Sequence, residues 1–256
     1  MKRVAAVLLA LYAIYAAVLV WVHPVLIYPF GADRFVADGW TQHRVEPQGT
    51  TLAYADGTQD VAVLFFMGNG GSLAYFTNAL DAHTQAGRTI AAPEYRGGAG
   101  IAGTPSETAL KADALVTFDW LDARHDGPIV VHGYSMGTAL ALYVASQRPV
   151  VGIVLDAPFV KMCELMMRAA YVPACYLPFV QKWNSAALVP DLTAPVLVQH
   201  GTADQLVPLG DGARLVGLMR AAGLDVTFSV VEDATHNNIA GQPGYRISIN
   251  QFIAGL

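Results

Sequence analysis

Charged residues are scarce in this chain of 256 residues: only 14% are Asp, Glu, Lys or Arg, whereas 54% are hydrophobic. Such a chain is not intrinsically disordered, because disordered chains are poor in apolar residues and rich in net charge. The formal net charge is −5, and there is no basic run beyond Lys2-Arg3. Nucleic acid is therefore not an expected partner, since its phosphates are bound by clustered Lys and Arg.

Cysteine is also scarce, with only Cys163 and Cys175 in the chain. Two cysteines cannot form a disulfide framework, and their spacing is not that of a structural zinc site. No metal is expected, and no cofactor, because the glycines of residues 68–71 lack the Lys-Ser/Thr pair of a phosphate-binding P-loop. The two cysteines can pair if the domain is exported to an oxidising compartment, and two buried free thiols are the equal alternative.

One long hydrophobic run is present, at the N-terminus. Residues 4–22 are 19 uncharged residues that follow Lys2-Arg3, and as a helix they extend about 28 Å, close to one hydrocarbon core. Positive charge tends to stay in the cytoplasm, so we expect residues 1–24 to form an uncleaved, single-pass signal anchor with the rest of the chain outside the cytoplasm. His23-Pro24 is expected where this helix ends. A cleaved signal, giving a secreted or periplasmic domain, and a buried soluble helix are the alternatives.

The remaining residues, 25–256, alternate between apolar runs and helical patterns. Buried strands separated by helices predict an α/β fold, with a mainly parallel central sheet and helices on both faces. Residues 28–54 are expected to add early antiparallel strands. The six apolar runs are 60–67, 89–93, 128–133, 150–155, 195–200 and 226–231, and the helical patterns are 73–86, 106–124, 136–147 and 211–222.

The alternation breaks between the fourth and fifth apolar runs. Residues 158–190 have no strand pattern and are rich in methionine, proline and aromatic residues, so we expect a small helical lid inserted at this point. Flexible methionines suit a surface that faces an apolar ligand, which makes Met162 and Met166 candidate substrate-binding residues. A helical cover packed on the core is the alternative.

Residues 133–137 read Gly-Tyr-Ser-Met-Gly, a G-x-S-x-G sequence. The pattern is weak by itself, but an apolar strand enters it and a helical stretch leaves it, as in a nucleophile elbow. The glycines permit a sharp strand-to-helix turn, which lifts the Ser135 hydroxyl out of the sheet at the positive end of a helix. Ser135 is therefore the candidate nucleophile.

A serine hydroxyl needs an adjacent base, and that base needs an orienting carboxylate. Asp204 follows the fifth apolar run and His236 follows the sixth, and the order Ser135, Asp204, His236 is that of α/β-hydrolase triads. We expect the three side chains to converge, because parallel strands end at the same edge of a sheet. Asp233 is the alternative partner of His236.

In these motifs the sequence resembles the serine hydrolases of the α/β-hydrolase fold, and more narrowly the membrane-anchored Bem46-like branch that includes ABHD13 and ABHD17. The resemblance covers residues 25–256 and implies an oxyanion hole made by the backbone N–H groups of Met136 and Asn69. Gly70 is the fallback donor and a candidate substrate-binding residue. The matching segments are 66–71, 94–100, 104–107, 133–137, 156–159, 200–204 and 235–237.

The sequence departs from the family pattern at two positions. Met67 stands where the family usually has histidine, so the loop that carries Asn69 lacks the hydrogen bonds of that imidazole. Glu94 replaces a common aspartate. We interpret Glu94 as structural.

Together these residues predict hydrolysis of an acyl bond, in a carboxylic ester or a thioester, through an acyl-enzyme intermediate. A membrane anchor and an apolar lid favour a small-molecule acyl substrate that is apolar or lipid-like. A serine peptidase on the same triad is one alternative. A noncatalytic membrane-tethered binding protein of the same fold is another, and a cofactor-free perhydrolase is a third.

Overall fold

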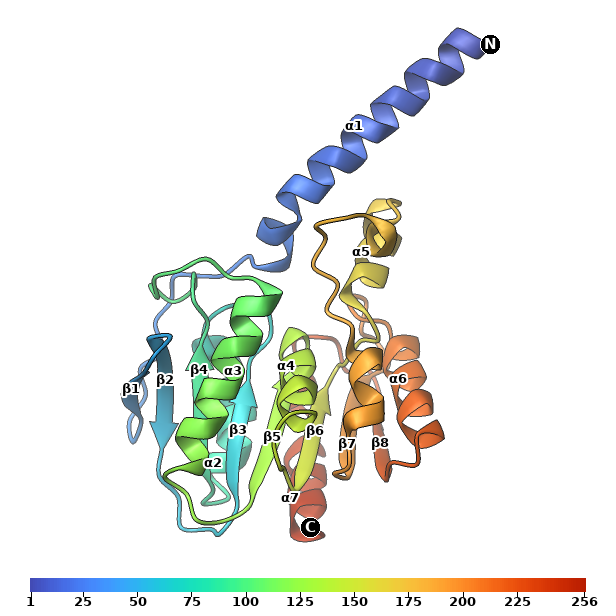
Figure 1. Ribbon diagram of the computed structural model, residues 1–256. Helices are drawn as coiled ribbons and strands as arrows, with labels where there is room; N and C mark the ends of the chain where they lie inside the picture. Colours follow the sequence, from blue (N-terminus) through green and yellow to red (C-terminus); the bar gives the residue numbers. More distant parts are fainter.

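The computed structural model describes residues 1–256 and is built around one eight-stranded sheet in the order β1-β2-β4-β3-β5-β6-β7-β8 (Figure 1). Strand β2 runs antiparallel to both β1 and β4, and all other neighbours are parallel. The strands are β1 (Thr41–Val45), β2 (Thr50–Ala55), β3 (Ala62–Phe66), β4 (Thr89–Glu94), β5 (Ile129–Tyr134), β6 (Gly152–Asp156), β7 (Val196–Gly201) and β8 (Val226–Val231).

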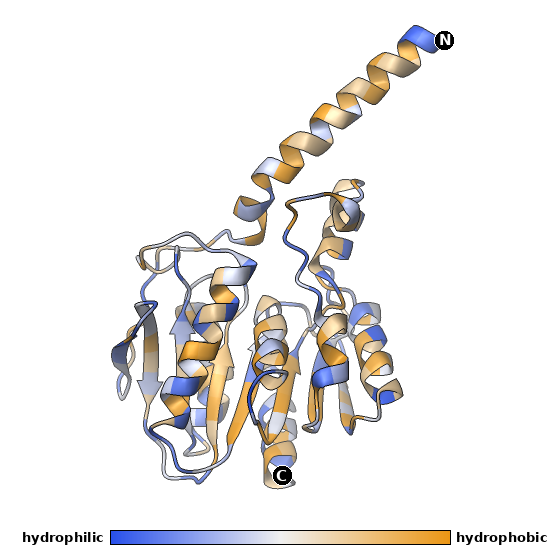
Figure 2. Ribbon diagram, in the orientation of Figure 1, coloured by the Kyte–Doolittle hydropathy of each residue, from blue (hydrophilic) through white to orange (hydrophobic).

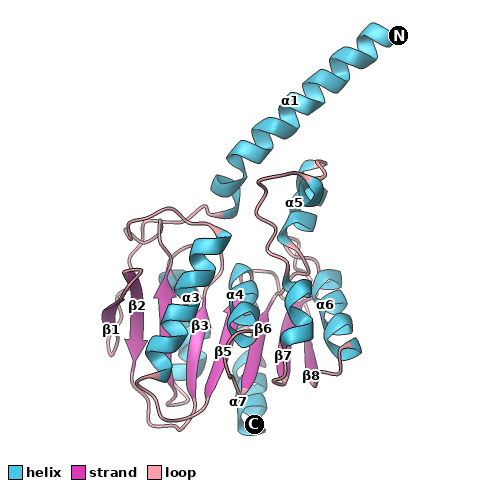
Figure 3. Ribbon diagram, viewed as in Figure 1, coloured by secondary structure: helices cyan, strands magenta, loops and turns pink.

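Helices cover both faces of the sheet (Figure 3). Helices α3, α4 and α6 lie on one face, and α2 and α7 lie on the other. The α-helices are α1 (Lys2–Ile27), α2 (Thr77–Thr84), α3 (Glu107–Asp122), α4 (Met136–Ala145), α5 (Met162–Ala170), α6 (Leu209–Ala221) and α7 (Tyr245–Ala254). Short 3₁₀ helices are η1 (Leu73–Phe76), η2 (Ala174–Tyr176), η3 (Ser185–Asp191) and η4 (Ile239–Gly241).

The predicted fold class is confirmed. All six apolar runs form strands, and β1 and β2 are the antiparallel pair expected within residues 28–54. Every residue of β3, β5, β6 and β7 is buried, which explains why each of these strands begins as an apolar run and does not alternate between apolar and polar residues. Helix α7 was not predicted, although Tyr245, Ile249 and Ile253 recur at helical spacing and are buried against the core.

Helix α1 projects from the domain and is apolar along almost its whole length (Figure 2). It does not end at His23-Pro24 as expected but continues to Ile27. Proline lacks an N–H, so the Val20 carbonyl loses its helical partner. The imidazole Nδ1 of His23 replaces that partner and donates to the Val20 carbonyl at 2.6 Å, which allows the helix to pass through Pro24.

The base of α1 is joined to the domain through Gln181. The backbone N–H of Gln181 donates to His23 Nε2 at 3.1 Å. The Tyr28 hydroxyl and the backbone N–H of Glu107 both donate to the Gln181 side-chain oxygen. His23 and Tyr28 are buried, so this end of α1 is packed as part of the domain rather than as a free tether.

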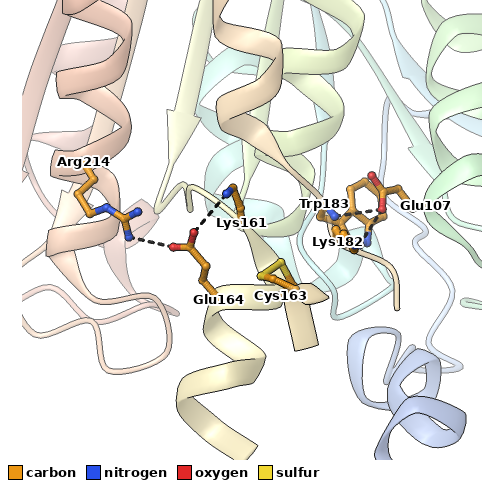
Figure 4. Close-up of a disulfide and its surroundings, with 8 residues drawn as sticks. Glu107, Lys161, Cys163, Glu164, Lys182, Trp183 and Arg214 are labelled. Atoms are coloured by element: carbon orange, nitrogen blue, oxygen red, sulfur yellow. Dashed lines mark hydrogen bonds and ion pairs between the residues drawn. A yellow bond between two sulfur atoms is a disulfide. The ribbon is translucent and has the colours of Figure 1, made fainter. Parts of the chain in front are cut away.

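The connection between β6 and β7 carries α5, η2 and η3 on the same end of the sheet as α1. Cys163, at the start of α5, forms a disulfide with Cys175, with an S–S distance of 2.00 Å. Figure 4 shows Glu164 next to this disulfide, paired with Lys161 at 3.6 Å and with Arg214 of α6 at 2.9 Å. Of the two alternatives for the cysteines, the structure contains the disulfide.

Candidate active site

Ser135 lies in a sharp turn between β5 and α4. Its φ is 51° and its ψ is −116°, a conformation rarely adopted by residues other than glycine. The glycines on either side are required sterically. A Cβ on Gly133 would lie 2.4 Å from the Gly137 carbonyl oxygen, and a Cβ on Gly137 would lie 2.0 Å from the Phe66 carbonyl oxygen.

The side chains of Ser135, His236 and Asp204 lie in a line. His236 Nε2 is 2.9 Å from Ser135 Oγ, and His236 Nδ1 is 2.8 Å from Asp204 Oδ2. An ionised carboxylate only accepts hydrogen bonds, so Nδ1 carries the proton and Nε2 is left to accept the serine hydroxyl. All three residues are buried, and they come from the turns after β5, β7 and β8, as the sequence order predicts.

The Asp204 carboxylate is held ionised by its surroundings. Burial alone would raise its pKa, but hydrogen bonds from His200 and His236 and from the Val207 N–H hold the pKa of Asp204 well below its usual range. Its Oδ1 accepts the backbone N–H groups of Leu206 at 2.9 Å and Val207 at 2.8 Å. These bonds leave Oδ2 directed at the imidazole.

Tyr134, next to the serine, holds the loop that carries His236. Its hydroxyl donates to the His236 backbone carbonyl, and its ring packs edge-on against the imidazole. The alternative carboxylate, Asp233, is exposed, and its backbone N–H donates to Thr202 Oγ1 at 2.9 Å. The carboxylate that contacts His236 is therefore that of Asp204.

Two residues near Ser135, Met136 and Asn69, are the predicted donors of backbone N–H groups to an oxyanion. Met136 is the first residue of α4, and the first N–H groups of a helix have no carbonyl partner within it. Asn69 follows β3 and borders the same space as Ser135; its side-chain amide donates to the Ile27 carbonyl at 3.2 Å. The Met67 carbonyl, in the same loop, accepts the Tyr95 hydroxyl at 2.7 Å, so the loop is fixed without the usual histidine.

Ser135 lies between two cavities of different character. One has a volume of about 280 Å³, and 16 of its 19 lining residues are hydrophobic, with Met162 and Met166 among them. The other has a volume of about 330 Å³, is more polar, and is bordered by Gly70 and His236. The predicted substrate-binding residues are thus divided, with the methionines on the apolar side and Gly70 on the polar side.

Part of the apolar cavity is formed by α1, which the sequence did not predict. Five α1 residues line it, together with residues of α5 and the loop that follows. A hydrophobic run gives the same pattern for a membrane span and for a cavity wall, so only His23, the polar residue that directly follows the run of residues 4–22, offered a signal. The five residues are Leu19, Val20, His23, Leu26 and Ile27.

A buried polar network lies behind the serine. His132 Nε2 and the Tyr245 hydroxyl both contact Asp156 Oδ2, at 2.8 Å and 2.5 Å, and the Asp156 backbone carbonyl accepts the Ser135 N–H at 2.8 Å. The network joins β5, β6 and α7 beneath the turn that carries Ser135. No group of three or more His, Cys, Asp and Glu side chains is placed to hold a metal ion.

Comparisons with known proteins identify the class of protein to which this fold belongs, that of the alpha/beta hydrolases. Residues 61–173 match the family model described as alpha/beta hydrolase fold. The chain is 32% identical over 219 residues to the uncharacterized protein Rv2307c of Mycobacterium tuberculosis, which covers 83% of this chain and 74% of that protein. The chain therefore belongs to the alpha/beta hydrolase fold family.

Other relatives agree with this family. The chain is 28% identical to lysophosphatidylserine lipase ABHD12 of Macaca fascicularis over 172 residues, which is 60% of this chain and 42% of that protein. Among solved structures, the esterase Pf2001 of Pyrococcus furiosus superposes with a TM-score of 0.73 at 17% identity, covering 89% of this chain and 97% of that one. An alpha-beta hydrolase from Vibrio vulnificus gives 0.72 at 22% identity, covering 88% and 89%. At these identities the solved structures show the fold alone.

Proposed function

We propose that the protein is a membrane-anchored serine hydrolase that cleaves the acyl bond of a carboxylic ester or thioester with an apolar or lipid-like acyl group. One observation carries the proposal. His236 bridges Ser135 and Asp204 at 2.9 Å and 2.8 Å, and the serine lies at the junction of an apolar and a polar cavity. The apolar cavity suits the acyl chain, and the polar cavity suits the leaving alcohol or thiol.

In this mechanism His236 Nε2 takes the proton of Ser135 Oγ as the oxygen attacks the substrate carbonyl carbon. Asp204 fixes the imidazole tautomer and stabilises the imidazolium. The backbone N–H groups of Met136 and Asn69 donate to the developing oxyanion, and donors fixed in advance lower the barrier most. His236 then gives its proton to the leaving oxygen or sulfur. Water repeats the sequence on the acyl-enzyme and releases the acid.

We also propose that α1 anchors the chain in a membrane, with the domain outside the cytoplasm. Helix α1 is long and apolar enough to cross a bilayer, and its N-terminal Lys2-Arg3 favours the cytoplasmic side for that end. The disulfide between Cys163 and Cys175 is in keeping with an oxidising compartment. The proposal assigns a role to each part of the chain. Residues 1–24 are the anchor and residues 25–256 are the hydrolase domain, in which residues 158–190 form the lid.

The relatives support an ester-cleaving activity, but they do not single out one branch of the family. The relatives include lysophosphatidylserine lipases named ABHD12, of which the chain spans 42% of the length in Macaca fascicularis and Rattus norvegicus. Membership of the Bem46-like branch, with ABHD13 and ABHD17, stays a prediction.

The test uses the Ser135→Ala variant and a short p-nitrophenyl ester, with a fluorophosphonate probe as a second readout. We expect the wild type to hydrolyse the ester and to be labelled at Ser135, and Ser135→Ala to lose at least about 1000-fold in kcat and all labelling. A matched control is Ser146→Ala, at the other end of α4, which should behave as wild type. A wild-type protein that is neither labelled nor able to release product would favour the noncatalytic binding alternative, and cleavage of peptides rather than esters would favour the peptidase.

A further inference from the structure

An exposed apolar surface of the domain lies beside α1, at the end of α5 and on the connection that follows it. Residues 169–180, here called the apolar loop, are twelve consecutive residues without a charge or a histidine. Arg168 precedes the apolar loop, and Lys182 follows it after one glutamine. Apolar segments flanked by long cationic side chains are typical of chain that enters a membrane, because the cations can reach back to the interface.

The apolar loop has two faces. Val172, Ala174 and Val180 are buried and line the apolar cavity. By contrast, Tyr171, Tyr176 and Phe179 point outward and are 85%, 82% and 90% exposed. The disulfide from Cys175 to Cys163 ties the apolar loop to α5, so the aromatic side chains are presented by a stapled segment rather than by a free one.

The apolar loop is also bonded to the middle of α1. The Tyr12 hydroxyl donates to the Tyr171 carbonyl at 2.8 Å, and the Tyr15 hydroxyl donates to the Ala170 carbonyl at 3.0 Å. The last carbonyls of a helix have no partner within it, and in hydrocarbon such groups must be satisfied by the protein. These bonds satisfy two hydroxyls and two carbonyls that water would otherwise solvate.

The hydrogen bond from Tyr12 places the apolar loop alongside the proposed membrane span. If α1 crosses a hydrocarbon core of about 30 Å that begins at Val4, the core ends near His23. Tyr12 then lies about 16 Å inside the end nearest the domain, at about 1.5 Å per residue. The Tyr171 carbonyl lies beside this part of α1, within reach of the Tyr12 side chain, because it accepts the Tyr12 hydroxyl.

We infer that the apolar loop inserts together with α1 into the membrane leaflet nearest the domain, so that the cavity at Ser135 opens toward lipid rather than toward water. This inference rests on the proposed membrane location of α1. The occupant of the exposed aromatic face is the hydrocarbon of that leaflet, since the face is continuous with α1. Two charged pairs join α5 to α6, one between Glu164 in the first turn of α5 and Arg214, and one between Arg168 in its last turn and Asp211.

The direct test is photocrosslinking in phosphatidylcholine vesicles that contain the full chain. The photoreactive residue p-benzoylphenylalanine replaces Phe179, or Leu11 of α1, or Ile247 of α7, all of which are exposed. We expect lipid adducts, detected by mass, at positions 179 and 11 and none at 247. Adducts at 11 without adducts at 179 would overturn the inference alone. No adduct at either position would overturn the membrane location of α1, whether or not the protein is an esterase.

A functional test uses Phe179→Asp and Tyr176→Asp, neither of which lines a cavity. A charge on the inserted face disfavours insertion, so we expect each variant to lose about tenfold in the hydrolysis of a long-chain ester embedded in vesicles. Hydrolysis of a soluble short-chain ester should stay unchanged, as should both rates in the control Ile247→Asp. Equal vesicle rates for Phe179→Asp and wild type would contradict the inference, as would equal losses on both substrates.

Discussion

Glu94 gives the chain a pH-dependent stability that can be measured without knowledge of the substrate. Its side chain is 4% exposed, and its Oε2 has no hydrogen-bond partner. Burial raises the pKa of the Glu94 carboxyl from its ordinary 4.5 to about 7, partly offset by the backbone N–H groups of Phe35 and Leu73. The folded protein therefore binds a proton at this site that the unfolded chain has released at the same pH.

The sign of the effect follows from proton linkage. Between pH 4.5 and about 7, the native state holds more protons than the unfolded state, so stability falls as the pH rises. At about 1.4 kcal/mol per pH unit, the full loss is about 3 kcal/mol above pH 7. Glu94→Gln keeps the shape of the protonated side chain and removes the titration. We therefore expect it to be about 3 kcal/mol more stable than wild type at pH 8 and equal to it at pH 4.

The measurement is urea unfolding of the full chain in mild detergent at pH 4, 6 and 8, followed by near-ultraviolet circular dichroism. The matched control is Glu46→Gln, because the Glu46 side chain is 68% exposed; this variant should follow wild type at every pH. A Glu94→Gln variant no more stable than wild type at pH 8 would refute the reasoning. A gain of the same size at pH 4 would also refute it, because such a gain could not come from titration.

Three further predictions concern the site. Asp204→Asn should lower kcat on a soluble ester by about 10⁴-fold with native circular dichroism, because an amide toward His236 Nδ1 favours the wrong tautomer; a loss under tenfold would contradict the role of Asp204. Gly137→Ala should lower the free energy of unfolding by about 3 kcal/mol or more, because its Cβ would meet the Phe66 carbonyl. The control Gly217→Ala, with open space around its Cβ, should be neutral or stabilising by under about 1 kcal/mol in the same unfolding assay. Met166→Trp should fill part of the apolar cavity and reduce kcat/KM for long-chain esters by about tenfold relative to short-chain esters; an unchanged ratio would remove Met166 from the acyl site.

The residues that meet at Ser135 were accessible from sequence because each belongs to a local pattern. Ser135 is recognisable from the glycines that permit its backbone conformation, and Asp204 and His236 each follow an apolar run. Parallel strands bring such positions to one edge of the sheet, so chain order was sufficient to predict their meeting. Their catalytic roles stay predictions until the variants above are measured.

Features that depend on distant packing were not accessible in this way. The local rule that proline ends a helix failed at Pro24, because the neighbouring His23 side chain supplies the missing donor. The cavity wall formed by α1 was hidden, because apolar residues suit both lipid and cavity. The pairing of Cys163 with Cys175 also depended on how α5 and the following loop fold together, which spacing alone does not determine.

The hydrogen bond between Gln181 and His23 makes the base of the N-terminal helix a structural part of the domain. Five of its residues line the apolar cavity that borders Ser135, so the proposed membrane anchor is also one wall of that cavity. A chimaera in which an unrelated hydrophobic helix is fused at residue 28 would stay on the membrane and keep its three reactive side chains. It would nevertheless lack one wall of the apolar cavity beside Ser135, and truncating the chain for easier purification would remove the same wall.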